Sequence, residues 1–148
     1  MSASLRAEMD EALSAVLADM HATAGALLQA LADERQALDV ADPAALNRAG
    51  DGKQASLKRL EELDVERLQL LREIDTPRTA EQNAWRTVLR ILRECQRGNQ
   101  RNGIIIGKRL EHVRGALAVL TGNQPDTTLY DPAGLVRHGG RSLPLARA

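Results

Sequence analysis

Apolar residues recur at steps of three and four through most of the first 120 residues, and this period constrains the fold more than any other feature. In the first stretch the repeating positions are Leu5, Met9, Leu13, Val16, Met20, Ala24, Leu27, Leu31 and Leu38. Such spacing places one apolar stripe along an α-helix. We therefore predict a first helix over residues 4–39, with the hydroxyl of Ser4 as its N-cap.

A second helix is predicted over residues 43–73. Asp42 can cap it, and Pro43 at the first helical position loses no hydrogen bond. Its apolar side is marked by Leu46, Leu57, Leu60, Leu63, Leu68 and Leu71. Gly50 and Gly52 each weaken the helix by about 1 kcal/mol relative to Ala. The sequence leaves open whether the helix is broken there.

A third and longer helix is predicted from Thr79, beyond the Thr76-Pro77 break, to about Leu120. Its apolar seam follows Trp85, Val88, Leu92, Cys95, Asn99, Asn102, Ile106, Leu110, Val113, Leu117 and Leu120. At 1.5 Å per residue this helix spans about 60 Å. It must therefore protrude from a small protein or lie along the other two helices.

The composition favours helices packed through aliphatic layers. Hydrophobic residues make up 43% of the chain, yet there is no Phe, one Trp and one Tyr. Leu and Ala layers between long helices suit such a chain better than a globular core with bulky fillers. We predict an all-α fold: a long antiparallel three-helix bundle or coiled coil over residues 1–121. Residues 122–148, with four Gly and three Pro, are predicted to be a disordered C-terminal tail.

Charge is unevenly distributed although the formal net charge is zero. Residues 1–77 hold 8 Lys/Arg and 15 Asp/Glu, whereas residues 78–114 hold 9 basic and 3 acidic residues. A basic segment can bind nucleic acid. We favour instead an acidic helix pair that attracts a basic third helix within the bundle, because no aromatic stacking platform accompanies the arginines. We expect no nucleic-acid partner.

No set of residues suggests catalysis, a cofactor or a metal. His21, His112 and His138 fall on different segments, and none has a partner at metal-ligand spacing. Residues 103–108 lack the spacer and the Ser/Thr of a phosphate-binding loop. Cys95 is alone, so no intramolecular disulfide can form and a reducing compartment is expected. The sequence thus predicts a non-enzymatic protein.

The sequence also predicts a cytoplasmic location without membrane insertion. The first six residues lack the apolar core of a signal peptide. No stretch approaches 18 consecutive apolar residues, the length that a membrane span requires.

The middle of the third helix has features of a binding surface. Ile104, Ile105 and Ile106 are consecutive, so they cannot all face one side of a helix. The resulting wide apolar band suggests two neighbours, its own bundle and a partner. Asn99 and Asn102 on the apolar seam have two compatible interpretations: a buried polar layer that fixes helix register, or a groove left open for a partner.

Part of the sequence resembles a known family. The run Asn99-Gln100-Arg101-Asn102-Gly103-Ile104-Ile105-Ile106 is similar to the Asn-x-x-Asn-Gly-x-Leu-Ile signature of FlgN-type flagellar export chaperones, with Ile105 where Leu is usual. Ala116-Leu117-x-x-Leu120 and Leu129-Tyr130-Asp131-x-x-Gly134 also resemble that family.

The resemblance implies a cytoplasmic chaperone of flagellar type III export. It would bind the C-terminal helices of the hook-associated proteins FlgK and FlgL, prevent their premature assembly and deliver them to the export gate. The implied client contacts are Asn99, Asn102, Ile105, Ile106, Leu110, Val113, Leu117 and Leu120. The implied gate contacts are Leu129, Tyr130 and Asp131. The alternative is a generic helical adaptor or coiled-coil protein, and a homo-oligomer is left open.

Overall fold

The computed structural model describes residues 1–121, 129–130 and 136–137 of the chain. Within the last turns of the long helix, side chains are described except at positions 109, 110, 113, 114, 117 and 120, and none is described from 121 onward. The chain divides into two compact units, Met1–Gly98 and Asn99–Ala148, and each is described by itself.

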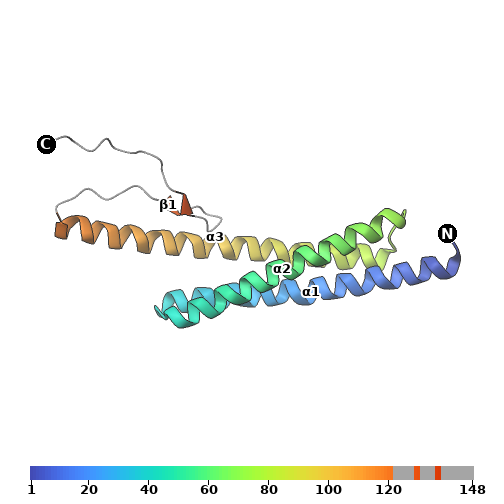
Figure 1. Ribbon diagram of the computed structural model, residues 1–148, viewed down its shortest axis with the longest axis horizontal. Coiled ribbons are helices and arrows are strands. Elements are labelled where there is room, and N and C mark those ends of the chain that lie inside the picture. Colours follow the sequence, from blue (N-terminus) through green and yellow to red (C-terminus); the bar gives the residue numbers. More distant parts are fainter. Residues whose placement is uncertain (122–128, 131–135, 138–148) are drawn as a thin grey trace. The chain divides into compact units, whose positions relative to one another are not determined.

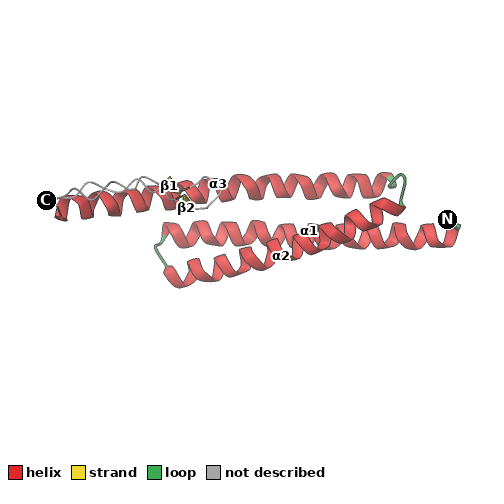
Figure 2. Cartoon of the chain, turned by 45° about the horizontal axis from the view of Figure 1, so that its top comes forward, coloured by secondary structure: helices red, strands yellow, loops and turns green. Residues whose placement is uncertain are grey.

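Three helices account for most of the described chain: α1 (Ala3–Asp39), α2 (Pro43–Glu73) and α3 (Thr79–Thr121) (Figure 1). Short loops join them, and α1 and α2 run side by side in opposite directions (Figure 2). The first part of α3 packs on this pair, while the boundary at Gly98 falls inside α3. The predicted all-α fold is confirmed, and each helix begins and ends within one residue of its predicted position.

Helices α1 and α2 each begin with a side chain that caps a backbone amide of the first turn. Asp42 caps α2, because its Oδ1 accepts from the Ala45 amide at 3.1 Å. The prediction for α1 was wrong: Ser2, not Ser4, is the cap, and its Oγ accepts from the Leu5 amide at 3.2 Å. Ser4 is already helical, and its hydroxyl donates to Glu8 at 3.4 Å.

The turn from α1 to α2 contains an alanine in the left-handed region. Ala41 has φ of 52°, a conformation that favours glycine. Its amide donates to the Leu38 carbonyl at 3.4 Å, and the Asp42 amide donates to the Ala37 carbonyl at 3.0 Å. These two bonds form a Schellman motif, which satisfies carbonyls at the end of α1.

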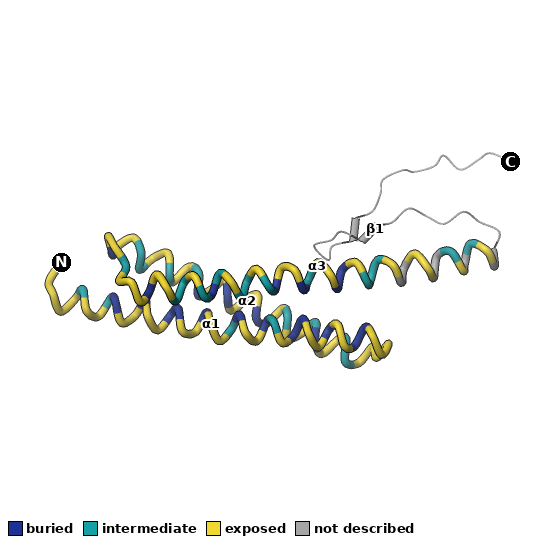
Figure 3. The backbone as a smooth tube through the Cα atoms, turned by 180° about the vertical axis from the view of Figure 1, so that it is seen from behind, coloured by how far each residue is buried: buried dark blue, intermediate teal, exposed yellow. Residues whose placement is uncertain are grey.

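The hydrophobic core lies where the three helices meet within Met1–Gly98 (Figure 3). Its largest fully buried side chains are Leu13, Met20, Leu63, Ile74 and Val88. Helix α1 supplies most of the core, as its apolar stripe predicted. Three predicted stripe positions are wrong, because Leu5, Leu57 and Leu68 are exposed.

Helix α2 is continuous through both glycines that left its course open. A Cβ at Gly50 would meet nothing within 4 Å, and one at Gly52 would lie 3.7 Å from the Cβ of Ala30, an ordinary contact. Neither glycine breaks the helix. Gly52 lies opposite α1, where small residues line both helices.

Helix α1 contains an 18-residue window with a mean hydropathy of 1.3, long and apolar enough to cross a membrane by length and composition alone. The sequence predicted no membrane span, because no stretch approaches 18 consecutive apolar residues. Only 39% of this window is buried inside the structure. Buried core helices pass the same test, and α1 is the principal core helix here, so the result is weak support for a span.

The region predicted to be a disordered tail lies mostly outside the described residues. Two short strands are described in it, β1 (Leu129–Tyr130) and β2 (Val136–Arg137). They pair antiparallel, with Leu129 opposite Arg137 and Tyr130 opposite Val136. The sequence did not predict this pairing, since these residues show no alternating pattern long enough to indicate a strand.

Candidate functional site

A network of charged side chains ties the start of α3 to α1. The Arg6 guanidinium lies 3.1 Å from the Asp10 carboxylate and donates to the Thr76 carbonyl at 2.6 Å. Arg78 lies 3.9 Å from Asp10 and bonds to Glu81 through Nε at 2.8 Å. Asp10 and Glu81 are both buried. The network therefore fixes the α2–α3 connection against α1, which is a structural role.

Glu81 has the electrostatic environment of a carboxylate held in its charged form. The hydrogen bond from Arg78 lowers the pKa of Glu81 below its ordinary value, against the opposing effect of burial. Its Oε2 has no hydrogen-bond partner among the described residues. Beside it lies a cavity of about 80 Å³, lined by apolar residues such as Leu13, Leu17 and Trp85. This cavity is far smaller than a ligand pocket, which typically encloses about 300–1,000 Å³.

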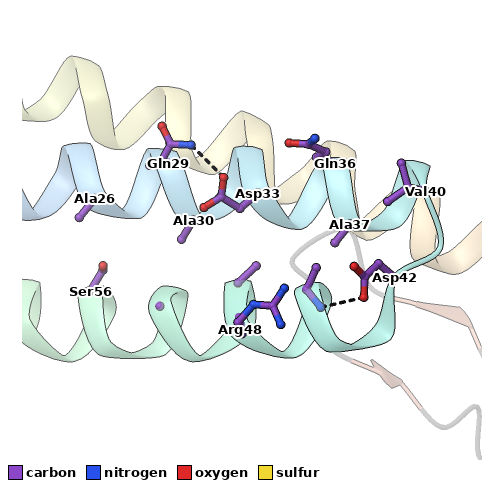
Figure 4. A pocket seen from close by; sticks show the side chains of 13 residues that line it. Ala26, Gln29, Ala30, Asp33, Gln36, Ala37, Val40, Asp42, Arg48 and Ser56 are labelled. Atoms are coloured by element: carbon purple, nitrogen blue, oxygen red, sulfur yellow. Dashed lines mark hydrogen bonds between the residues drawn. The ribbon is translucent and has the colours of Figure 1, made fainter.

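A larger groove of about 700 Å³ runs between the C-terminal half of α1 and the N-terminal half of α2 (Figure 4). Ala30 and Ala37 point from α1 toward α2, and Ser56 points back from α2 (Figure 4). Polar side chains form the rim, where Gln29 donates to Asp33 at 2.9 Å. The groove offers small apolar contacts and amide groups, and it has no convergent set of acid, base or nucleophile.

The described residues provide no other site for chemistry. No group of three or more His, Cys, Asp or Glu among them could hold a metal ion. The Cys95 thiol is buried and donates to the Ala24 carbonyl at 3.6 Å. Burial raises the pKa of this thiol, so it is held in its unreactive protonated form.

The five arginines from Arg78 to Arg97 differ in how they contact the acidic helices. Arg78 pairs with carboxylates of the bundle. The next four arginines, Arg86, Arg90, Arg93 and Arg97, are exposed and form no ion pair with any described carboxylate. Among these five arginines, only Arg78 forms an ion pair with a described carboxylate. The other four form none, because they face away from the core.

Four of the eight predicted client contacts have described side chains. Asn102 is 2% exposed, and Asn99, Ile105 and Ile106 are half-buried. Both asparagines make interactions within the chain, which favours the polar-layer interpretation for Asn102. Ile104, which we did not include, is 50% exposed. The side chains of the other four, Leu110, Val113, Leu117 and Leu120, lie outside the described residues.

Two of the three predicted gate contacts, Leu129 and Tyr130, form strand β1. Asp131 lies outside the described residues. The paired strand brings Tyr130 opposite Val136, a relationship that the sequence alone did not indicate.

A protein-family model described as FlgN protein matches residues 9–138. The chain belongs to the FlgN family. The match covers all three helices almost completely and both strands. No curated protein and no solved structure matches the chain.

Family membership gives the function at a general level. The chain is a flagellar export chaperone for hook-associated proteins, it is non-enzymatic, and it acts in the cytoplasm. The resemblance that residues 99–106 indicated is thereby confirmed. An apolar surface on a helix, rather than a catalytic pocket, is what such a function requires.

Proposed function

We propose that this FlgN-family chain binds the C-terminal helices of FlgK and FlgL along α3 beyond Gly98. The client would lie against the exposed side of α3 as an amphipathic helix, with aliphatic side chains of both partners in contact. Such a contact would hide the client surface that otherwise drives premature assembly.

The observation that carries this proposal is the change in burial along α3. Val88 and Cys95 belong to the hydrophobic core, and no described residue of α3 after Cys95 does. Ile104 is 50% exposed and Val119 is 84% exposed, although both are large aliphatic residues. A helix that continues to Thr121 with aliphatic side chains open to solvent has surface available for a partner.

The expected affinity follows from the six aliphatic candidates, Ile105, Ile106, Leu110, Val113, Leu117 and Leu120. Their full burial gives about 9–18 kcal/mol before costs. Ordering of the client and loss of rigid-body freedom remove much of this, which leaves a dissociation constant of about micromolar to nanomolar. That range suits a chaperone that must release its cargo.

The two asparagines have different places in this proposal. Asn102 is buried and makes an interaction within the chain, which supports a role in fixing the helix beneath the client surface. Asn99 is half-buried and lies one turn before it, at the start of the proposed surface.

The test changes the proposed surface to carboxylates. In Ile106→Asp with Leu110→Asp, we expect binding of a FlgK C-terminal fragment to weaken at least about tenfold, because two apolar contacts become desolvated charges. Titration calorimetry measures the affinity, and circular dichroism checks the fold. The matched control is Val65→Asp with Leu68→Asp, two exposed apolar residues on α2. Unchanged client binding in a folded Ile106→Asp/Leu110→Asp variant would remove the proposed surface.

We further propose that the residues after Gly122 dock on the export gate through Leu129, Tyr130 and Asp131. A chain truncated after Gly122 should keep its client affinity and lose export of FlgK from the cell. Tyr130→Ala in the full chain should give the same result with a smaller change. Loss of client binding on truncation would instead move the cargo site into the tail.

A further inference from the structure

Four exposed arginines form a straight ladder on the outer face of α3. Arg86, Arg90, Arg93 and Arg97 are spaced at i, i+4, i+7 and i+11, so each occupies the same side of successive helical turns. The ladder is about 16 Å long at 1.5 Å per residue. All four lie within Met1–Gly98, and the proposed client surface begins after Gly98 in the sequence.

No described carboxylate of the same chain pairs with the ladder. The core side of this part of α3 is formed by Val88 and Cys95, which lie about half a turn away around the helix. Apart from a 3.5 Å contact from Arg86 to the Asn83 amide oxygen, none of the four guanidinium groups has a polar side-chain partner among the described residues. A row of like charges repels itself along a helix unless a partner neutralises it.

Helix α2 carries a row of opposite charge at the same spacing. Glu62, Glu66, Gln69 and Glu73 also stand at i, i+4, i+7 and i+11, and all four are exposed. Glu62 makes one exposed contact with Arg59 at 3.5 Å, and Glu66 and Glu73 make no ion pair with a described cation. The spacing is the same when the row is counted from either end. Its three carboxylates therefore face three of the four arginines, whether the two helices lie parallel or antiparallel.

The acidic row also borders a groove that suits arginine side chains. Glu66, Gln69 and Glu73 line a shallow groove of about 490 Å³ between α1 and α2, together with Met9, Ala12, Val16 and Leu70. An arginine has an apolar stem and a charged head, so its stem can cover apolar surface while its head reaches a carboxylate. The planar guanidinium can also bind a carboxylate through two hydrogen bonds.

We propose that two copies of this chain associate, with the arginine ladder of one copy on the acidic row of α2 in the other. The matched spacing, the opposite charges and the adjoining apolar groove together identify the arginine ladder of a second copy as the partner of the acidic row. The contact joins two different surfaces, the ladder of one copy and the acidic row of the other, so it is a heterologous contact. The contact is mostly exposed ion pairs, so it is weak, reversible and sensitive to salt.

The test measures the mass of the full chain by sedimentation equilibrium at low and high salt. We expect a reversible dimer at low salt whose dissociation constant rises at least about tenfold when salt reduces the screening length from about 10 Å to about 3 Å. Arg90→Glu with Arg93→Glu should be monomeric, and so should Glu66→Arg with Glu73→Arg. Glu and Arg are both good helix formers, so the exposed changes keep the helices intact.

An equimolar mixture of these two variants tests directly whether the ladder contacts the acidic row. In each variant alone, at least one ion pair of the contact becomes a repulsion between like charges. In the mixture, the unaltered ladder of the second variant meets the unaltered acidic row of the first, so the dimer should be restored. The control, Arg35→Glu with Arg48→Glu, makes the same charge change at exposed positions outside the ladder and should leave the dimer intact.

Three results would overturn the proposal: a wild-type chain that stays monomeric at low salt and high concentration, a dimer that neither variant weakens, or a mixture that stays monomeric. A monomer that binds duplex DNA, and loses this binding in Arg90→Glu with Arg93→Glu, would also overturn it by assigning the ladder to nucleic acid. Both charge variants should keep the client affinity of the wild-type chain, and this measurement tests the proposed cargo surface separately from the dimer.

Discussion

The Arg67 guanidinium carbon lies 3.8 Å from the centre of the Trp85 ring, so a cation on α2 stacks on the chain's single tryptophan in α3. The same guanidinium bonds to Asp64 at 2.9 Å, and the Arg67 side chain is only 13% exposed. A cation–π contact is stronger when it is shielded from water. This contact therefore joins two helices that periodicity alone could not orient.

Arg67→Ala should lower the free energy of unfolding by about 1–2 kcal/mol, through loss of the stacked cation. Arg67→Lys keeps the charge without the planar group and should lose less. Trp85 fluorescence during urea unfolding measures the change and reports the altered ring environment directly. The control is Arg59→Ala, whose side chain is 47% exposed and pairs with Glu62 at 3.5 Å; it should change stability by less than about 0.5 kcal/mol. Equal losses in the two alanine variants would contradict the assignment.

Acid should weaken the fold through Glu81. Because Arg78 lowers the pKa of folded Glu81 below its ordinary value of 4.5, the unfolded chain takes up a proton at higher pH than the folded chain does. The stabilisation is thus complete above pH 4.5 and is lost as the pH falls through the lower folded value. Glu81→Gln should be less stable than wild type at pH 7, and the difference should narrow with acid.

Thermal unfolding across the acid range measures this difference for both chains. Gln keeps the size of the side chain and cannot titrate, so a constant gap between the two curves from neutral to acid pH would show that the Glu81 charge contributes nothing. The matched control is Glu61→Gln on the exposed face of α2, which should leave the acid slope unchanged.

Two leucines of α2 that look alike in the sequence differ in burial. Leu63 is fully buried and Leu57 is 38% exposed. Leu63→Ala should therefore destabilise the fold by about 2–5 kcal/mol, since it leaves a cavity. Leu57→Ala should cost less than about 1 kcal/mol, because little apolar area is lost. Chemical denaturation of both variants provides the comparison, and similar losses would mean that Leu57 is covered in solution.

The same pair shows what the sequence could predict. Steps of three and four located all three long helices, and α2 and α3 begin at Pro43 and Thr79 as predicted. Three residues fall about 60° short of one helical turn. Leu57 and Leu63 are two such steps apart, so they point about 120° away from each other. The spacing alone therefore cannot say which of the two leucines is buried. Only the position of the neighbouring helices decides which side is covered.

The candidate site was predictable to a smaller extent. The run from Asn99 to Ile106 is local, so it indicated the family and the proposed cargo helix without any structure. The contact of Arg6 with Thr76 joins residues far apart in the chain, and no local pattern marks it. The basic excess of α3 was visible as charge, but only the structure shows that Arg90 and Arg93 face solvent.

Ala41 gives the last prediction, because it adopts φ of 52° at the end of α1. Its Cβ makes the left-handed conformation unfavourable by about 1–2 kcal/mol, and glycine removes that penalty while gaining freedom in the unfolded chain. Ala41→Gly should therefore raise the free energy of unfolding by about 0.5–1 kcal/mol.

The opposite exchange at Gly25 provides the matched comparison. Gly25 is inside α1, and a Cβ there meets nothing within 4 Å, so Gly25→Ala should also stabilise the fold, by about 0.5–1 kcal/mol. Glycine helps in the turn and alanine helps in the helix because each suits its local backbone. Thermal unfolding of the two single variants and of the double variant should give additive gains. A loss of stability in Ala41→Gly would mean that residue 41 leaves the left-handed region in solution.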